Sequence, residues 1–435
     1  MKNYCIVGAG SRGLSMFAQD LVGHYRDVAR LTGLADINPG RVAHACRVLG
    51  SGVEGFTDFD EMLDRVPCDV VIVTTKDATH DDFIVRAMRR GKDVITEKPM
   101  TTDAAKCRRI LATERETGQN LRVTFNYRYA PYKTEVKRLL RSGIVGEIHS
   151  VEFRWFLDTV HGADYFRRWH RKKENSGGLL VHKATHHFDL INWWLDLEPE
   201  SVAAMGSRHY YVPSRKPGHG KRCAECAIAD SCEFYLDLGA DPALRALYQE
   251  NEHFDQYYRD GCVFSEEIDI EDTMSVLIRY PREIQVTYAL TAATSFEGWQ
   301  VAFNGSLGRL EAFEPEHFVT EPLSQNFAER SQSAIRRSVD WRMAGEGASP
   351  NVENLSIKFY PLFGGVQTFE VAHQSQGHGG GDRRLKDHLF RGVQEDPLGH
   401  AAGSRAGAMS ILVGVAANQS MVQGRFVRID DLLHD

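Results

Sequence analysis

The chain has 435 residues, 42% of them hydrophobic and 26% charged, with a formal net charge of −7. Its length suits two domains that each bury a core, and its acidic balance argues against a nucleic-acid or anionic-membrane binder. No apolar stretch reaches the roughly 18 residues of a membrane span. The first expected strand begins almost at Met1, so we expect no signal peptide and a cytoplasmic protein with mostly reduced cysteines.

The first 125 residues alternate between short apolar runs and helical patterns. Strands are expected at 5–7, 31–35, 70–73 and 94–95. Helices are expected near 12–23, 40–49, 79–90 and 102–116. Strands separated by amphipathic helices indicate βαβ units and a parallel sheet. The sequence therefore predicts an α/β fold that begins with a doubly wound Rossmann domain over residues 1–125.

The pattern changes after about residue 145, where longer strands with partial alternation are expected. These strands lie at 147–156, 274–280, 283–290 and 301–303. Residues 126–435 are therefore predicted to form a second α/β domain with an open, mostly antiparallel sheet. A cysteine-rich insertion is expected at about 213–262. The polar segment 320–354 has little periodicity and is expected to be a loop or partly disordered.

A glycine motif, Gly8-Ala9-Gly10-Ser11-Arg12-Gly13, closes the first strand and opens the first helix. This arrangement is typical of a dinucleotide site. Glycine at 8 allows a tight turn, glycine at 10 lets backbone approach the pyrophosphate, and glycine at 13 lets helix and strand pack closely. The diphosphate would lie at the helix N-terminus, beside Ser11 and Arg12.

Asp36, at the end of the second expected strand, is placed to accept hydrogen bonds from ribose hydroxyls. A carboxylate at that position repels the 2′-phosphate of NADP, so NAD is the expected cofactor. Asp36 could instead be a solvated turn residue. Arg12 and Arg41 could still accommodate a phosphate, which keeps NADP as the less favoured alternative.

Glu97-Lys98-Pro99 follows the short strand 93–96. Together with the glycine motif, this tripeptide resembles the Gfo/Idh/MocA oxidoreductases, which act on sugars and polyols. The resemblance implies NAD-dependent hydride transfer at a secondary hydroxyl of a small sugar, glycoside or polyol. It also implies a homodimer or homotetramer in which the open sheet packs against its copy.

Lys98 is the first candidate catalytic residue. A lysine between a nicotinamide and a substrate is partly desolvated, which lowers its pKa and lets it assist the reacting hydroxyl. Glu97 would orient this lysine or the cofactor. A surface salt bridge is the alternative role for Lys98. The resemblance also implies that Thr74, His80 and Asn126 line the nicotinamide side, although His80 could equally be a helix-cap histidine.

Residues 177–189 resemble the family motif in which two glycines precede an aspartate, a histidine one helical turn later and a trailing aspartate. By that resemblance His186 takes the histidine position and Asp189 the trailing aspartate, while Lys183 adds a second cation. His182 stands where the family usually has aspartate, which puts the usual proton relay in doubt. His182 and His186 are four residues apart and share a helical face, so both can address one ligand. A zinc pair or helix-cap roles are the alternatives.

Two further segments could contact the substrate. Residues 165–173 are dense in cations and aromatics, and Arg167 or Trp169 could contact sugar hydroxyls or faces. His378 follows Gly377 in a glycine run that lets backbone come close to a ligand. Solvated or flexible loops are the alternative for both.

Cys223-x-x-Cys226-x5-Cys232, with Cys262 further along, could hold a structural Zn²⁺ through four thiolates. Disulfides are disfavoured by the expected compartment. Independently packed thiols remain an alternative, and an iron–sulfur cluster lacks the usual spacing.

Two other functions stay open. One is an NAD-assisted glycosidase or lyase that oxidises its substrate transiently and then eliminates a substituent. Lys98 with His186 could serve the oxidation, and His182 or His378 the elimination. The other is a catalytically silent NAD-binding regulator, against which the intact Glu97-Lys98 argues.

Overall fold

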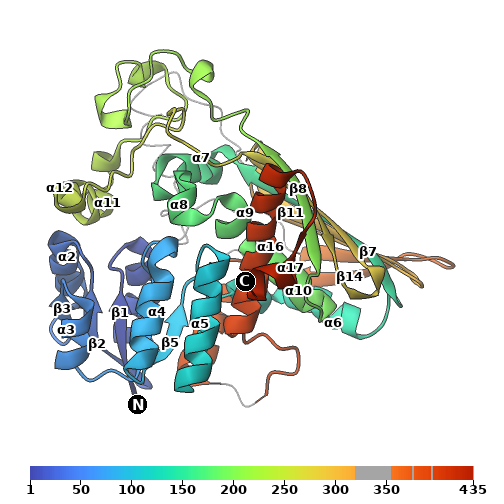
Figure 1. The fold of residues 1–435 in the computed structure, drawn as a ribbon, viewed down its shortest axis with the longest axis horizontal. Coiled ribbons are helices and arrows are strands. Elements are labelled where there is room, and N and C mark those ends of the chain that lie inside the picture. The colour runs from blue at the N-terminus through green and yellow to red at the C-terminus, as the bar shows by residue number, and fades with distance from the viewer. Residues whose placement is uncertain (319–353, 375–376, 393–394, 435) are drawn as a thin grey trace.

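The computed structural model describes residues 1–318, 354–374, 377–392 and 395–434. Within these ranges the chain forms two sheets with helices around and between them (Figure 1). The polar segment expected at 320–354 lies outside the described residues, apart from Asn354.

The N-terminal sheet has six strands among the described residues, in the order β3-β2-β1-β4-β5-β6. The bounds are β1 Lys2–Val7, β2 Ala29–Ala35, β3 Glu54–Phe56, β4 Val70–Val73, β5 Asp93–Thr96 and β6 Leu121–Val123. All pairs are parallel, and every residue of β4 is buried, as expected for a strand covered on both faces. This order is that of a doubly wound dinucleotide-binding fold, which confirms the predicted Rossmann domain.

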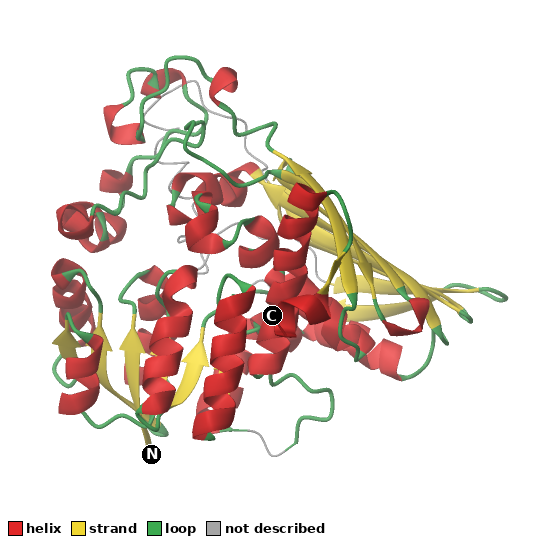
Figure 2. Cartoon of the chain, viewed as in Figure 1, coloured by secondary structure: helices red, strands yellow, loops and turns green. Residues whose placement is uncertain are grey.

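Helices cover both faces of this sheet (Figure 2). They are the π-helical turn η1 Arg12–Ala18 with α1 Gln19–Val22, then α2 Pro39–Leu49, α3 Phe59–Arg65, the 3₁₀ turn η2 Asp77–Thr79, α4 His80–Arg89 and α5 Ala104–Thr117. The carboxyl ends of the strands therefore meet the helix N-termini at one edge, where ligands bind in such sheets.

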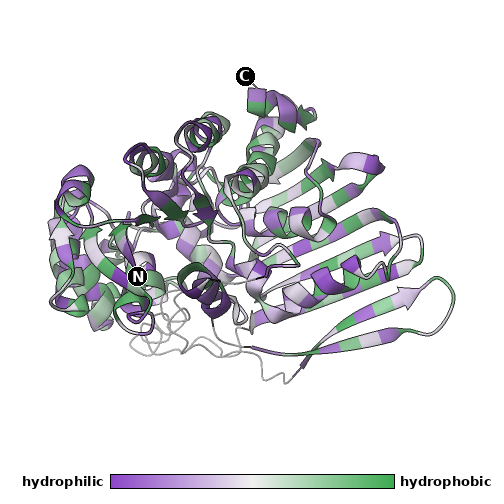
Figure 3. Ribbon diagram, turned by 90° about the horizontal axis from the view of Figure 1, so that it is seen from below, coloured by the Kyte–Doolittle hydropathy of each residue, from purple (hydrophilic) through white to green (hydrophobic). Residues whose placement is uncertain are grey.

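The second sheet has nine strands among the described residues, in the order β14-β13-β12-β11-β7-β10-β9-β8-β15. The bounds are β7 Ile148–Asp158, β8 Ser201–Ser207, β9 Thr273–Arg279, β10 Gln285–Thr294, β11 Phe296–Gly305, β12 Gly308–Phe318, β13 Asn354–Pro361, β14 Gln367–Ala372 and β15 Val427–Arg428. Only β7 and β10 pair in parallel among these strands. Burial alternates along β9, and Figure 3 shows hydrophilic and hydrophobic residues alternating along the strands. The predicted open, mostly antiparallel sheet is confirmed.

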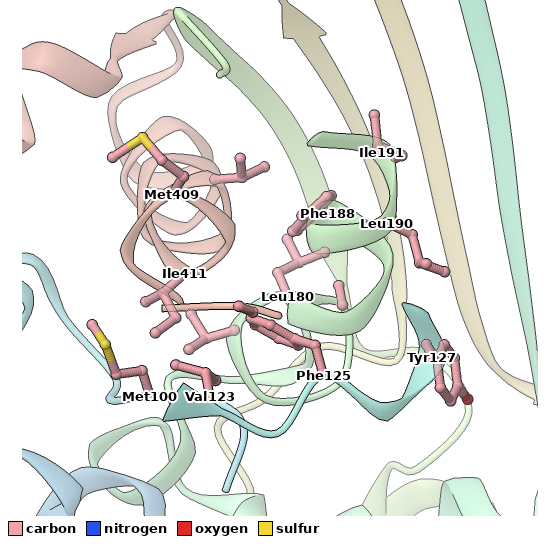
Figure 4. Packing of buried hydrophobic residues seen from close by; sticks show 14 of the residues in the cluster. Met100, Val123, Phe125, Tyr127, Leu180, Phe188, Leu190, Ile191, Met409 and Ile411 are labelled. Atoms are coloured by element: carbon pink, nitrogen blue, oxygen red, sulfur yellow. The ribbon is translucent and has the colours of Figure 1, made fainter. Parts of the chain in front are cut away.

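The buried face of this sheet packs on helices of the C-terminal half. These helices include α6 Pro131–Arg141, α7 Thr159–Arg167, α8 Lys173–Ser176, α9 Leu179–His182, α10 Thr185–Leu195, α16 Ser404–Gln423 and α17 Ile429–His434. The helix α15 Gly381–Arg391 packs instead on the Rossmann half, where Leu385 and Phe390 join the cluster of Leu14 and Phe17. α16 connects the two halves, because it contacts both β6 and β8. Figure 4 shows Met409 and Ile411 of α16 among Met100, Val123 and Phe188.

The close packing of α16 depends on a glycine. A Cβ atom at Gly414 would lie 2.3 Å from the carbonyl oxygen of Leu180 in α9, so any larger residue would push the two helices apart. α16 therefore fixes the position of α9 and α10. No helix among the described residues, α16 included, is both long enough and apolar enough to cross a membrane.

The cysteine-rich insertion, residues 213–262, consists of short helical turns and loops (Figure 2). Its helices α11 Pro242–Leu247 and α12 Glu252–Asp255 lie beside α2 of the Rossmann domain (Figure 1). Leu244 and Leu247 are buried in the same hydrophobic cluster as Leu14 and Phe17. The insertion thus packs on the N-terminal half, although it follows the second domain's β8 in sequence.

Candidate active site

The glycine loop between β1 and η1 has the close packing that the motif predicts. Gly8 has a φ of 104°, and a Cβ there would lie 2.6 Å from the Thr74 carbonyl oxygen. A Cβ on Gly13 would lie 2.2 Å from the Gly8 carbonyl oxygen. The Thr74 hydroxyl donates to that same Gly8 oxygen at 2.8 Å. The loop is therefore a tight backbone cradle at a helix N-terminus, which fits a dinucleotide pyrophosphate.

Asp36 lies beside the glycine loop at the end of β2. Its carboxylate accepts hydrogen bonds from the Ala9 backbone N–H at 2.8 Å and from the Asn38 backbone N–H at 2.9 Å. It also pairs with Arg41, whose Nη2 is 3.1 Å from Asp36 Oδ1. An acid held at this place fits the ribose hydroxyls of NAD.

Lys98 follows β5 at the same edge of the sheet. Its Nζ donates to the His182 carbonyl oxygen at 3.3 Å, which joins the Rossmann edge to α9. Burial, together with the positive charge of Lys183, lowers the pKa of Lys98 to about 8. Glu97 Oε1 accepts from Arg12 Nε at 2.7 Å. This ion pair ties the Glu97-Lys98 turn to the glycine loop.

His182 has a partner that the sequence did not reveal. Its Nδ1 lies 2.5 Å from Oδ2 of Asp77, which begins η2 after β4. Burial raises the pKa of Asp77 and lowers the pKa of His182, so it disfavours the charged form of each. His182 occupies the motif position that usually carries aspartate, and Asp77 places a carboxylate against this histidine. The position of Asp77 at the carboxyl end of β4 is the signal that could have identified it.

Lys183 lies among aromatic rings next to a buried acid. Its Nζ is 4.3 Å from the centre of the Trp155 ring and 3.8 Å from Glu297 Oε1. Glu297 Oε1 is also 2.6 Å from His161 Nδ1. Burial alone would raise the pKa of Glu297, but His161 and Lys183 hold that pKa below its ordinary value. Sequence reasoning missed Glu297 and His161, which approach the site from β11 and α7.

His186 stacks on Tyr127 with ring centroids 4.2 Å apart. Its Nδ1 is buried and has no hydrogen-bond partner within the described ranges. Burial and the charge of Lys98 lower the pKa of His186 well below its ordinary value. A neutral imidazole with an unpaired nitrogen can bind a polar group of a ligand.

Asn126 and His378 also meet beside Tyr127, whose ring centroid is 5.6 Å from that of His378. Asn126 Nδ2 lies 3.0 Å from His378 Nδ1 and donates to Asp382 Oδ1 at 2.5 Å. Burial would raise the pKa of Asp382, but His378 and Arg12 hold it below its ordinary value. Asn126 Oδ1 is buried and has no partner among the described residues. This oxygen can accept a hydrogen bond from a ligand, such as a nicotinamide carboxamide.

Three predicted site residues are engaged elsewhere in the structure. Asp189 pairs through both oxygens with Arg128, at 2.7 and 2.5 Å, and Arg167 donates to the Phe234 carbonyl oxygen of the insertion at 3.0 Å. Both residues make contacts inside the protein, and their expected contacts with substrate stay predictions. The two ring nitrogens of His80 face the carbonyl oxygens of Pro99 and Thr75, at 2.9 and 3.1 Å. His80 thus holds the turn that carries Lys98.

Trp169 remains near the site. It stacks on His170, with ring centroids 3.6 Å apart, and meets the His182 ring edge-on at 5.9 Å. A contact of Trp169 with substrate stays a prediction.

The prediction of a structural zinc is not supported. Cys223, Cys226, Cys232 and Cys262 line one small cavity, but no group of three or more potential ligands could hold a metal ion among the described residues. All four cysteines are free of disulfides. Two of the sulfurs accept hydrogen bonds from backbone: Cys226 Sγ from the Gly220 N–H at 3.3 Å and Cys262 Sγ from the Phe264 N–H at 3.4 Å. Burial raises the pKa of Cys262 to about 11.

A polar hollow of about 630 Å³ opens beside the glycine loop. It is lined by Arg12, Ser15, Met16, His373, Gln374, Gly377, Gly380, Asp382, Arg383, Arg384 and Lys386. Arg12 and Asp382 therefore join this hollow to the Glu97 and Asn126 groups.

Comparison with known families covers nearly the whole chain. Residues 2–125 match the model described as oxidoreductase family, NAD-binding Rossmann fold, and residues 137–429 match the model described as oxidoreductase family, C-terminal alpha/beta domain. A Bacillus subtilis (strain 168) relative named YteT is 35% identical over 451 aligned positions, which span 99% of each chain. An inositol 2-dehydrogenase of Rhizobium meliloti (strain 1021) is 30% identical over 179 residues, covering 41% of this chain and 51% of that enzyme.

Solved structures share the fold. An oxidoreductase from Agrobacterium radiobacter, in complex with NAD+, L-tartaric acid and magnesium, superposes with a TM-score of 0.64 at 14% identity over 99% of both chains. Levoglucosan dehydrogenase, in complex with NADH and levoglucosan, superposes with a TM-score of 0.66 at 16% identity over 98% of this chain and 99% of that one.

Proposed function

The chain belongs to the Gfo/Idh/MocA oxidoreductase family, and from this premise we propose that it transfers hydride between NAD and a secondary hydroxyl or ketone of a sugar, glycoside or polyol. The observation that carries the proposal is Lys98. This lysine lies at the sheet edge beside the glycine loop, contacts the His182 carbonyl oxygen and has a pKa lowered to about 8. A lysine with such a pKa can exchange a proton with a substrate hydroxyl near neutral pH.

Three groups of the chain would hold the cofactor: the glycine loop, Asp36 and Asn126. The glycine loop receives the pyrophosphate, and Asp36 accepts from the ribose hydroxyls. Asn126 Oδ1, which is buried and unpaired within the described part of the chain, accepts from the carboxamide. Bound NAD supplies the hydride acceptor. The carboxylate of Asp36 favours NAD over NADP.

Lys98 acts on the substrate proton. In its neutral form it accepts the proton of the reacting hydroxyl as the C–H bond gives up hydride, and in reduction it returns that proton to the alkoxide. His186 and Lys183, both buried beside Tyr127 and Trp155, orient the substrate hydroxyls. Arg12 and Glu97 hold the Lys98 turn against the glycine loop.

A test of this proposal measures stoichiometry. The protein is incubated with NAD+ and a panel of pyranosides, inositols and linear polyols, and NADH absorbance is followed. We expect one NADH per substrate oxidised, deuterium transfer to the cofactor from substrate deuterated at the reacting carbon, and intact glycosidic bonds. If a cofactor titration shows NAD binding but no member of the panel is oxidised or cleaved, the proposal is wrong.

A second candidate function is supported by the Asp77–His182 pair. This pair places another acid–base group next to Lys98, with His182 Nδ1 and Asp77 Oδ2 2.5 Å apart. After oxidation of one ring carbon, the ketone acidifies the adjacent C–H, and a second base can remove that proton while the neighbouring C–O bond breaks. Water would then add across the resulting C=C bond, which returns a solvent proton to the adjacent carbon, and NAD would be regenerated when the ketone is reduced again. Release of aglycone without net NADH, with solvent deuterium at the adjacent carbon, would favour this NAD-assisted elimination over simple dehydrogenation.

We also propose that the outer face of the second sheet pairs with another copy of the chain. Met205, Leu277 and Phe313 are exposed by 79%, 52% and 43%. The register from β8 through β12 places them on one face. Light scattering should report a homodimer or homotetramer that Leu277→Glu weakens, and a wild-type monomer would contradict this assembly.

A further inference from the structure

The insertion reaches the adenosine end of the cofactor site. Asn38, which follows β2, donates from Nδ2 to the Asn251 carbonyl oxygen at 2.8 Å and to Asp255 Oδ1 at 3.1 Å. A Cβ on Gly40, in the first turn of α2, would lie 1.9 Å from Asn251 Oδ1. The insertion therefore packs closely against the loop that carries the ribose-binding acid, as the position of α11 and α12 beside α2 in Figure 1 shows.

The same segment also touches the glycine loop. The Tyr248 hydroxyl accepts a hydrogen bond from the Ser11 backbone N–H at 2.7 Å and lies 2.9 Å from the Ser11 hydroxyl. Residues 248–255 thus contact both the pyrophosphate loop and the residues after β2. They are part of the structure that a bound dinucleotide would meet.

The charges in this region form a buried triad. Arg41 Nη2 contacts Asp36 Oδ1 at 3.1 Å and also contacts Asp255 Oδ2 of the insertion. The side chains of Arg41, Asp36 and Asp255 are only 8%, 10% and 13% exposed. Two carboxylates around one guanidinium leave a net negative charge where water screens it poorly.

This arrangement bears on the discrimination between NAD and NADP. An arginine shortly after the ribose acid is the group that could accommodate a 2′-phosphate, and Arg41 stands five residues after Asp36. With Asp36 alone, Arg41 could turn toward a phosphate. Asp255 takes the other contact of the guanidinium and adds a second negative charge near the ribose.

We propose that Asp255 is a cofactor-specificity residue, which holds Arg41 against Asp36 and thereby excludes the 2′-phosphate of NADP. The proposal rests on the proposed NAD-dependent function. It gives the cysteine-rich insertion a role that its sequence pattern did not indicate: the insertion supplies half of the charge that selects the cofactor. A repulsive element of this kind is a common source of specificity between closely related ligands.

A role limited to docking the insertion would have a different signature. If Asp255 only anchored α12, its removal would loosen the region and weaken NADH and NADPH binding together. A specificity role instead changes the ratio of the two affinities. The ratio is therefore the quantity to measure.

The test uses Asp255→Asn in the full chain, with NADH and NADPH dissociation constants from fluorescence titration. We expect the NADPH affinity relative to NADH to rise about tenfold or more, because like charges placed together cost several kcal/mol. The matched control is Glu250→Gln, which removes one negative charge from the same insertion. Glu250 is exposed and pairs only with Arg245 among the ion pairs of the described residues, so its ratio should stay near that of the wild type.

A second variant tests whether the gain in NADPH affinity depends on Arg41 or on a general loosening of the region around α12. In Asp255→Asn combined with Arg41→Ala, the gain in NADPH affinity should disappear, since the released arginine is what binds the phosphate. An unchanged ratio in Asp255→Asn with tight NADH binding in the wild type would overturn the role of Asp255 alone. Parallel weakening of both cofactors would also overturn it. Wild-type protein that binds neither nucleotide would overturn the proposed function as well.

Discussion

Two charged clusters at the carboxyl edge of one parallel sheet differ in how their charges are balanced. At the ends of β4 and β5, burial and Lys183 outweigh the nearby carboxylates, and the pKa of Lys98 falls to about 8. At the end of β2, Asp36 and Asp255 enclose Arg41 and hold the pKa of this buried guanidinium above its ordinary value. The first cluster can exchange protons near neutral pH, and the second stays charged.

This difference in charge balance distinguishes groups that can transfer protons from groups that bind and select a ligand. Displaced pKa values in a cleft mark groups that can act as acids or bases, whereas compensated charges fix geometry and select ligands. The Arg128–Asp189 pair, with hydrogen bonds of 2.7 and 2.5 Å, is partly compensated, because Arg128 offsets only part of the burial that raises the pKa of Asp189. It joins the end of the Rossmann domain to α10.

The largest expected effect comes from breaking the first cluster. Lys98→Met should lower kcat/KM by about 10²–10⁴, the usual contribution of a general acid or base. NADH affinity should change little, because the glycine loop and Asp36 are untouched. Steady-state kinetics and a fluorescence titration measure the two quantities. Lys92→Met, at the other end of β5, is the matched control, and near-normal activity of Lys98→Met would remove this lysine from the mechanism.

A smaller effect is expected from removing the charge of Lys183, and it tests whether this charge lowers the pKa of Lys98. The positive charge of Lys183 lowers the pKa of Lys98, so Lys183→Met should raise it. Oxidation needs the neutral amine, and its rate therefore rises as pH passes the Lys98 pKa. In the variant, this limb of the kcat/KM profile should move to higher pH. A limb that stays in place would show that Lys183 does not act through Lys98, and Lys172→Met serves as the control.

The smallest effect on the chemical step is expected for the compensated pair. Asp189→Asn leaves the buried Arg128 without its carboxylate, which should lower the free energy of unfolding by about 3–5 kcal/mol. The pH profile of the remaining activity should keep its shape. Denaturant unfolding and the pH profile test both statements. Glu198→Gln, which breaks the exposed pair with Arg405, should change stability little, and a shifted profile in Asp189→Asn would return Asp189 to the substrate site.

The sequence predicted what depends on local patterns. The glycine loop, Asp36 and Lys98 each lie within one strand and the turn after it, so a short motif was enough to nominate them as site residues. The parallel and antiparallel sheets followed from strand length and from the helices between strands.

The missed residues depend on contacts between distant segments. Asp77 meets His182, and Asp255 meets Arg41, only after both domains have folded. The zinc prediction is not supported among the described residues. Cysteine spacing suggested a common ligand, while the short helical turns direct Cys226 and Cys262 toward backbone N–H groups.

One hydrophobic cluster spans the boundary between the two family models, which match residues 2–125 and 137–429. Leu244, Leu247 and Tyr248 of the insertion, with Leu385 and Phe390 of α15, are buried together with Leu14 of the Rossmann half. Each such side chain contributes about 1.5–3 kcal/mol when fully buried. A fragment that stops at residue 125 would lose all five of these partners and expose its apolar side to water. We therefore expect the nucleotide-binding half to be less stable alone, since part of its apolar surface is covered by chain synthesised more than a hundred residues later.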